Sequence, residues 1–286
     1  MLTHSHRLQE RRREECPGYR RHPLTVYDDM NTPRPVPPVH APHIPLTDYY
    51  QTEQDRQAYL RRMFDNTAAD YDHIEAIFAW GSGSRYRRRA LIRGGLKAGM
   101  KVLDIGVGTG LVAAQACIVT GNAALVTGID PSPGMMAASK LPDTMVLIEG
   151  RAESLPFPDN HFDFLSMGYA LRHISDLDVA FAEFERVLKP GGRLCILEVT
   201  KPQSRFGRWL LKNYMRGVIP LLTRVVSKQK NTATIWRYHW DSVEACVTPE
   251  QVVATLSAAG LTQVKRHREL GVFSEYQAIK SDLAST

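Results

Sequence analysis

Short apolar runs alternate with helical segments through the middle of the chain. The runs that we expect to form strands lie at residues 101–105, 125–129, 145–148, 162–167 and 193–199. The intervening segments with a helical spacing of apolar residues are 111–119, 133–139 and 177–188. This alternation predicts a parallel sheet covered by helices on both faces, because each crossover helix packs back onto the sheet.

Two later apolar segments, 262–268 and 272–279, have only a short turn with Gly271 between them. So short a connection joins antiparallel strands, because parallel neighbours need a long crossover. Together with the five earlier runs they predict an α/β fold with a doubly wound, mostly parallel seven-stranded sheet. We expect the last strand to run against the others.

The amino-terminal region differs in composition from the rest. Residues 1–46 hold eight of the 17 prolines and few large apolar residues, which predicts an extended or disordered tail. From about residue 48 to residue 96 the apolar positions follow a helical spacing. We treat 47–286 as one domain with four parts: a helical cap (47–100), an α/β core (101–200), a basic lid (201–240), and a helix with a hairpin (241–286).

Composition excludes several classes of protein. The chain has 286 residues, of which 43% are hydrophobic and 23% charged, and no apolar run approaches the ~18 residues of a membrane span. The four cysteines lie far apart without a CxxC spacing. We therefore expect neither a disulfide framework nor a metal site, and we favour a reducing, cytoplasmic setting.

Positive charge is concentrated in one segment. The net charge is +6, yet residues 199–240 alone contain nine Lys and Arg and no acidic residue. Within 204–230, aromatic and aliphatic residues fall at helical spacing, with basic residues largely on other faces. This pattern is typical of a helix at an anionic membrane surface, and equally of a lid helix whose apolar side packs inward. Nucleic-acid binding is the weakest interpretation, and we expect none.

A glycine-rich turn follows the first predicted strand. It reads Gly106-Val107-Gly108-Thr109-Gly110 and lies two residues after Asp104. Glycines at such a turn allow the backbone to approach a ligand closely. The GxGxG spacing differs from the GxGxxG of dinucleotide sites, and a carboxylate at 104 would repel a pyrophosphate and attract an amine or another cation.

A second acid, Asp130, ends the second predicted strand. A carboxylate at this point of a nucleotide-binding fold accepts hydrogen bonds from both ribose hydroxyls. A nucleoside with a cationic, amino-acid-like end would suit Asp104 and Asp130 together. S-adenosylmethionine has this structure, and we predict it as the cofactor.

Residues 60–280 resemble the ubiquinone/menaquinone biosynthesis C-methyltransferases, a family of class I S-adenosylmethionine-dependent methyltransferases. The segments that carry the resemblance are 63–65, 69–72, 102–110, 128–135, 152–159, 169–173, 187–193, 198–202 and 236–238. The resemblance implies a Rossmann-like methyltransferase fold and transfer of a methyl group to an apolar aromatic acceptor. The substrate that the resemblance favours is an intermediate of quinone biosynthesis, which would be methylated on carbon.

The resemblance also implies roles for individual residues. Gly106 and Gly108 would pass under the methionine part, Asp130 would hold the ribose, and Tyr71 would close over the methionine end. Arg151 stands where the family usually has an Asp that accepts the adenine amino group. Since Arg has only donors, adenine would be held by stacking on the guanidinium or by backbone groups. The expected cofactor site comprises Tyr71, Asp104, Gly106, Val107, Gly108, Gly110, Asp130, Pro131, Met135, Arg151, Ala152 and Met167.

Methylation of a ring carbon needs a base, or a donor that stabilises the phenolate. The candidates after the fourth predicted strand are Tyr169, Arg172 and His173, and those from the later segment are Tyr238, His239 and Asp241. Arg172 has an alternative interpretation as a surface ion-pair partner of Asp176 or Asp178. His173 has one as a helix-start residue, and His239 has one as packing.

Two other functions remain open at this point. One is methylation of another small aromatic or polyketide-like molecule. The other is a cofactor-binding protein of this fold without methyl transfer, which the departure at Arg151 favours.

Overall fold

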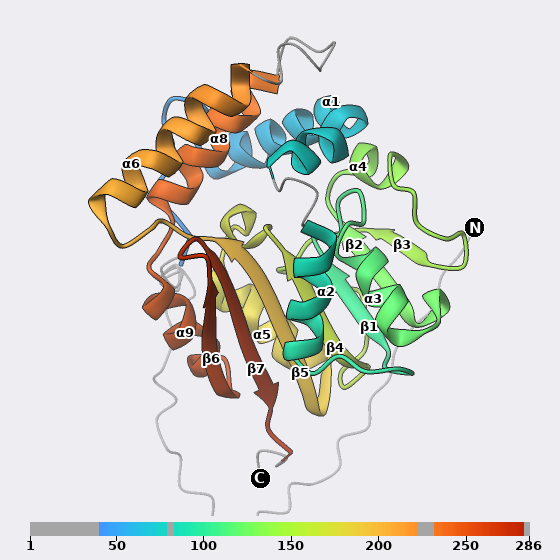
Figure 1. Cartoon of the computed structure of the whole chain (residues 1–286). Helices are drawn as coiled ribbons and strands as arrows, with labels where there is room; N and C mark the ends of the chain where they lie inside the picture. The colour runs from blue at the N-terminus through green and yellow to red at the C-terminus, as the bar shows by residue number, and fades with distance from the viewer. Residues whose placement is uncertain (1–39, 79–82, 222–231, 283–286) are drawn as a thin grey trace, which may run out of the picture. The chain divides into compact units, whose positions relative to one another are not determined.

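The computed structural model describes residues 40–78, 83–221 and 232–282. Its centre is a seven-stranded sheet, as predicted, and the strand order is β3-β2-β1-β4-β5-β7-β6 (Figure 1). The strands are β1 (Val102–Ile105), β2 (Val126–Asp130), β3 (Val146–Glu149), β4 (Phe162–Gly168), β5 (Leu188–Val199), β6 (Leu261–Glu269) and β7 (Phe273–Lys280). The first five strands are parallel, and β7 pairs antiparallel with both β5 and β6.

Successive residues of the central strands face opposite sides of the sheet, and both sides are covered. Leu103 and Ile105 of β1 join one apolar cluster, while Val102 joins the other. The first cluster contains buried residues of α5 (Leu177–Val187) and α9 (Pro249–Ala258), and the second contains those of α2 (Gly83–Arg93) and α3 (Ala113–Thr120). Burial on both faces explains why apolar residues occupy adjacent positions in these strands, such as Val102–Leu103 in β1 and Phe164–Leu165 in β4.

The remaining helices lie at one end of the sheet, where Figure 1 shows α1, α6 and α8 together. They are α1 (Glu53–Phe78), α4 (Pro133–Ala137), α6 (Arg205–Asn213) and α8 (Thr232–Ala245), with a π-helical segment, η3 (Tyr214–Val218), after α6. Short 3-10 segments are η1 (Ala123–Leu125) and η2 (Leu171–His173). A third apolar cluster, with Met215, Ile219 and Trp240 at its centre and Phe64 at its margin, joins α1, α8 and η3.

The chain order reverses between β1 and β4, where β2 and β3 lie on one side and β5 on the other. Ligands of open parallel sheets bind at such a switch point, outside the carboxyl ends of the strands.

None of the helices in the described ranges combines the length and the apolarity that crossing a bilayer requires.

The structure differs from the sequence expectation at β5. Phe162 pairs with Leu188, and the register then shifts before Phe164 pairs with Arg193. Gly191, at a φ of 72°, lies within this irregular part of the strand. The sequence pattern predicted a helix through residue 188 and a strand that begins at 193, because Pro and Gly normally interrupt strands.

Residues 40–46 were expected to belong to the tail, yet they pack against the domain. The carbonyl of His40 accepts a hydrogen bond from the Leu177 amide (2.9 Å), and that of Pro42 accepts one from the Val247 amide (2.7 Å). The rest of the expected tail, residues 1–39, lies outside the described residues.

Candidate active site

The glycine-rich turn after β1 adopts conformations that favour glycine. Gly106, Gly108 and Gly110 have φ values of 68°, 55° and 90°. A Cβ added to Gly106 would lie 2.6 Å from the Cβ of Ala170, much closer than real Cβ contacts. The turn is also tied to β2, because the amides of Gly106 and Val107 both donate to the Ile129 carbonyl (2.8 and 3.1 Å).

The carboxylate of Asp130 connects the end of β2 to this turn. Its Oδ2 accepts a hydrogen bond from the Gly108 amide and its Oδ1 accepts one from the Ser132 amide, both at 2.8 Å. Burial raises the pKa of Asp130 to about 6, although the two backbone donors act in the opposite direction. The carboxylate is therefore held rigidly, and its protonation changes in the acid part of the physiological range.

Asp104 lies beneath the turn and is almost fully buried. Its Oδ1 accepts a hydrogen bond from the Ser166 hydroxyl (2.6 Å), while Oδ2 has no hydrogen-bond partner among the described residues. Burial raises the pKa of Asp104 to about 7. A cation bound over the turn would favour its ionised form, because an opposite charge stabilises a carboxylate.

Two acids of α1 hold that helix over the site. Asp65 accepts hydrogen bonds from the Ser132 hydroxyl (2.6 Å) and the Gly134 amide (3.0 Å) at the start of α4. Two helical turns later, Asp72 accepts one from the Thr109 hydroxyl of the glycine turn (2.6 Å). Residues seven apart lie on the same face of a helix, so one face of α1 covers the site. The sequence analysis included both acids in the segments that carry the resemblance but assigned them no role.

A cavity of about 180 Å³ opens over the turn and is bounded by the ends of β1, β2 and β4 and by α1. Among the expected cofactor residues, those that line it are Tyr71, Gly106, Val107, Gly108, Asp130, Pro131, Met135, Arg151, Ala152 and Met167. Among the expected catalytic residues, Tyr169 and His173 line it and Arg172 does not. Asp104 and Gly110 do not line the cavity.

Arg172 points away from the cavity into a buried ion pair. One of its Nη atoms donates to Glu198 Oε1 on β5 (2.5 Å) and to the Tyr169 carbonyl (2.9 Å). The expected alternative, a surface pair with Asp176 or Asp178, is wrong, because the Arg172 side chain is only 2% exposed and its partner 1%. A buried charge requires a buried partner of opposite sign.

His173 forms part of an aromatic cluster at the cavity wall. Its ring stacks with Tyr238 at 5.8 Å and meets Phe64 edge-on at 5.2 Å. Neither ring nitrogen has a hydrogen-bond partner in the part of the chain that the structure describes. Burial, together with the charge of Arg172, holds the pKa of His173 well below its usual value, so the ring is neutral at physiological pH.

The candidates from the later segment lie behind this wall. His239 donates a hydrogen bond from Nδ1 to the Ile235 carbonyl (3.0 Å), and burial lowers its pKa to about 3. Asp241 accepts a hydrogen bond from the Tyr49 hydroxyl (2.6 Å) and pairs with Arg216 at 3.4 Å. Neither residue lines the cavity, so their surroundings favour packing and tethering.

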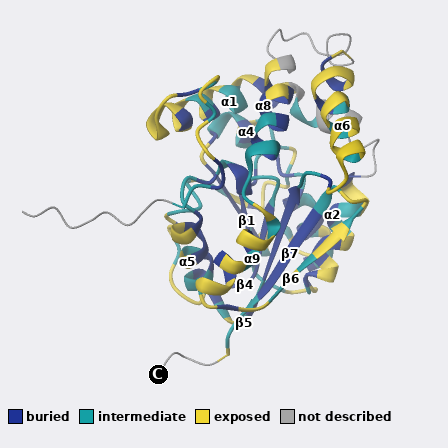
Figure 2. Cartoon of the chain, turned by 90° about the vertical axis from the view of Figure 1, so that its left-hand side faces the viewer, coloured by how far each residue is buried: buried dark blue, intermediate teal, exposed yellow. Residues whose placement is uncertain are grey.

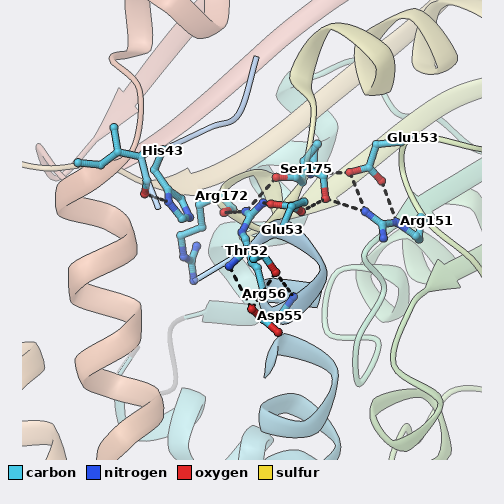
Figure 3. Close-up of polar contacts among 11 residues, drawn as sticks. His43, Thr52, Glu53, Asp55, Arg56, Arg151, Glu153, Arg172 and Ser175 are labelled. Carbon is cyan, nitrogen blue, oxygen red and sulfur yellow. Dashed lines mark hydrogen bonds and ion pairs between the residues drawn. The ribbon is translucent and has the colours of Figure 1, made fainter. Parts of the chain in front are cut away.

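A chain of polar contacts joins the cavity edge to the start of α1 (Figure 3). Arg151 donates to the Ser175 hydroxyl (2.7 Å), which in turn donates to Glu53 Oε1 (2.5 Å). Arg56 donates to the carbonyls of Arg172 (3.0 Å) and Ile174 (2.9 Å). The guanidinium of Arg151 therefore holds a fixed position at the cavity edge.

Glu53, Arg56 and Ser175, which form this chain of contacts, were not among the residues expected from the sequence. They have no local signal, because the contacts that tie α1 to the cavity edge join positions more than a hundred residues apart along the chain.

Comparison with known proteins now identifies the family. A model of the ubiE/COQ5 methyltransferase family matches residues 51–280. The chain belongs to the ubiE/COQ5 methyltransferase family. It is 32% identical over 224 residues to the ubiquinone/menaquinone biosynthesis C-methyltransferase UbiE of Shewanella halifaxensis, covering 76% of this chain and 88% of that protein. It is also 32% identical to the demethylmenaquinone methyltransferase of Symbiobacterium thermophilum, covering 73% and 87%.

Solved structures agree with the fold of this ubiE/COQ5-family chain. A SAM-dependent methyltransferase from Thermotoga maritima superposes with a TM-score of 0.54 at 19% identity, covering 78% of this chain and all of that one. Phosphoethanolamine N-methyltransferase 2 of Haemonchus contortus, in complex with S-adenosyl-L-methionine, has a TM-score of 0.56 at 18% identity, covering 77% and 60%. The chain is an S-adenosylmethionine-dependent methyltransferase with a Rossmann-like fold.

Proposed function

We propose that this enzyme methylates a ring carbon of an apolar aromatic acceptor, a quinol intermediate of quinone biosynthesis. The observation that carries the proposal is the cavity itself, which continues from the glycine turn to an apolar wall of Leu60, Phe64 and Tyr71. A flat, apolar ring fits such a wall better than a charged or strongly hydrated acceptor does. The names of the two bacterial relatives support the same class of acceptor.

The residues present suit the cofactor. Gly106 and Gly108 of the turn line the cavity without side chains, and the unpartnered Oδ2 of buried Asp104 favours positive charge above the turn. In this proposal Asp130 holds the ribose hydroxyls and Tyr71 covers the methionine end. Pro131, Met135 and Ala152 would surround the adenine. Arg151, held by Ser175 and Glu153, offers donors only, so it would contact the adenine by its flat face.

When bound, the cofactor supplies a methyl group on a sulfonium, whose leaving group is a neutral thioether. The protein has to align the acceptor carbon, exclude water and increase the electron density of the ring. A neutral His173 accepts a hydrogen bond from the acceptor hydroxyl, which orients the ring and increases the electron density on the phenol oxygen. Tyr169, which has a positive φ of 60° and lies under the guanidinium of Arg87, completes the wall beside it.

A labelling experiment tests the acceptor class. The enzyme is incubated with methyl-labelled cofactor and a lipid extract that contains demethylated quinol, and the lipid and aqueous fractions are separated. We expect the label in a quinol lipid. Label in a small aromatic of the aqueous phase would favour the alternative acceptor, and transfer to neither fraction would contradict the proposal.

Replacement of His173 by alanine should lower kcat by about a hundredfold, the usual contribution of a positioned proton acceptor. Cofactor affinity should change by less than about twofold, because the ring lies on the acceptor side. His173→Asn, which keeps an acceptor atom, should recover part of the rate. The matched control is His267→Ala on the exposed face of β6. If kcat remained within twofold of the original, His173 would have no such role.

Cofactor affinity should depend on pH through Asp130. Its pKa of about 6 in the free protein is raised by burial, and ribose hydroxyls favour the ionised carboxylate. Protonation of Asp130 should therefore lower the affinity about tenfold between about pH 7 and pH 5, since one pKa unit corresponds to a tenfold change. Titration calorimetry with S-adenosylhomocysteine in buffers of different ionisation enthalpy measures the linked proton. The Asp130→Asn variant should lose this pH dependence of the affinity. An affinity that does not change with pH in the unmodified protein would contradict the prediction.

A further inference from the structure

Helix α6 has apolar residues on two opposite sides. The inner side continues through the π-helical segment, where Met215 is buried, to Ile219, which is also buried. These two residues pack against Trp236 and Trp240 of α8. This side therefore explains the lid interpretation of the sequence, in which an apolar stripe packs inward.

The outer side is covered by nothing in the described part of the chain. Phe206, Trp209 and Leu210 are 71%, 60% and 54% exposed, and the stripe continues at Val218 and Leu221. Their spacing is helical, and the rings of Phe206 and Trp209 stack at 6.0 Å. Figure 2 shows α6 coloured mainly as exposed. A contiguous apolar patch of this kind marks an interaction surface.

The polar residues beside this stripe are all basic or neutral. Arg205, Arg208 and Lys212 are exposed, and none forms an ion pair with another described residue. Arg216 pairs with Asp241, which lies just outside the acid-free segment 199–240. The surface thus offers large apolar side chains and uncompensated positive charge together.

Charge selects among the occupants that such a surface could bind. A second copy would bring the same positive charge, and like charges in contact repel. Residues 1–39 contain seven Arg and five acidic residues, so this segment is also net positive. A nucleic acid would match the charge, but Leu210, Val218 and Leu221 provide no stacking surface for bases. Anionic lipid matches both the apolar and the basic residues, because such helices insert apolar side chains at the headgroup boundary.

We propose that the outer face of α6 binds to an anionic lipid bilayer, with Phe206, Trp209 and Leu210 inserted at the headgroup boundary. Arg205, Arg208 and Lys212 contact the lipid phosphates. The inner face of the same helical segment belongs to the cluster that includes Phe64 and Tyr71 of the cavity wall. The bilayer therefore lies one helix away from the acceptor side of the cavity. The inference itself does not depend on which acceptor is methylated.

Co-sedimentation with vesicles tests this inference on the full chain. The vesicles contain either phosphatidylcholine alone or an equal mixture of phosphatidylcholine and phosphatidylglycerol. We expect binding to the mixed vesicles, weaker binding at high salt, and little binding to phosphatidylcholine alone. Trp209→Glu/Leu210→Glu and Arg208→Glu/Lys212→Glu should each lower the partition coefficient by about tenfold or more.

Matched control variants separate a local effect from a general one. Leu270→Glu changes an equally exposed apolar residue at the β6–β7 turn, and Lys265→Glu/Arg268→Glu reverses two exposed charges on β6. Both controls should bind vesicles as the unmodified protein does. All variants should retain their unfolding temperature and their affinity for S-adenosylhomocysteine. A failure of the lipid-binding inference is therefore distinguishable from a failure of the proposed function.

Several outcomes would overturn the inference. One is unchanged vesicle binding by the α6 variants, and another is equal loss in the controls. A third is a change in the sedimentation coefficient of the α6 variants while their lipid binding is unchanged. This result would assign the face to contact with a second copy of the chain. A fourth is binding to a DNA or RNA oligonucleotide that is lost in the α6 variants while lipid binding remains, which would assign it to nucleic acid.

Discussion

Replacing Asp130 by alanine should lower the affinity for S-adenosylhomocysteine by about a hundredfold. Two ribose hydrogen bonds to a charged acceptor are lost, each contributing about 1.5 kcal/mol or more, and 1.4 kcal/mol is a tenfold change. The amides of Gly108 and Ser132 also lose their acceptor, so the turn is no longer held in place. Titration calorimetry measures the affinity, and circular dichroism verifies that the sheet remains folded.

The matched control is Asp143→Ala, which removes an exposed carboxylate from the β2–β3 connection. It should leave the affinity unchanged. A second variant, Gly106→Val, tests the turn without altering charge, because its Cβ would lie 2.6 Å from that of Ala170 at a φ of 68°. Unchanged affinity in a folded Asp130 variant would remove the proposed cofactor site.

Replacing Glu198 by alanine should destabilise the protein by about 3–5 kcal/mol, because it leaves the buried charge of Arg172 without a partner. For a domain of this size that corresponds to a decrease of roughly 10 °C in unfolding temperature. The loop with Tyr169 should also loosen, because the guanidinium that holds its carbonyl is no longer oriented. Urea unfolding and calorimetry measure the loss.

A double variant distinguishes the charge from the packing. Arg172→Met/Glu198→Leu removes both charges and should recover most of the lost stability, since apolar residues often replace a buried pair at little cost. Glu149→Ala, which breaks a half-exposed pair with Arg61 at 2.9 Å, should cost less than about 1 kcal/mol. A double variant no more stable than Glu198→Ala would contradict this account.

The sheet was predictable because its signals are local. Short segments with buried apolar residues mark β1, β2 and β4, and the turn with Gly271 allowed only an antiparallel last pair. The beginning of β5 was not predictable. Pro190 and Gly191 are typical of a loop, and they lie within the strand only because the residues on either side of them, Leu188 and Arg193, pair with β4.

The glycine turn, Asp104 and Asp130 were also recognisable, because each lies at or directly after the end of a predicted strand. The catalytic side was harder to predict. Tyr169 and His173 reach the cavity, but the partner of Arg172 is 26 residues away on the neighbouring strand, and the sequence offered nearer acids. Adjacent parallel strands bring their carboxyl ends together in space. Residues far apart along the chain therefore become neighbours there.

By itself, the sequence determined the type of fold, the position of the glycine turn and the charge of segment 199–240, because these depend on period, turn chemistry and composition. The tertiary structure alone decided which residues share the cavity and how α1 is attached, through contacts such as that of Arg56 with the Arg172 carbonyl, 116 positions away. It also decided that Met215 and Ile219, in and just after η3, pack against α8 while the outer side of α6 is exposed. A helical pattern records which residues share a side, but only the packing of neighbouring elements establishes which side is buried.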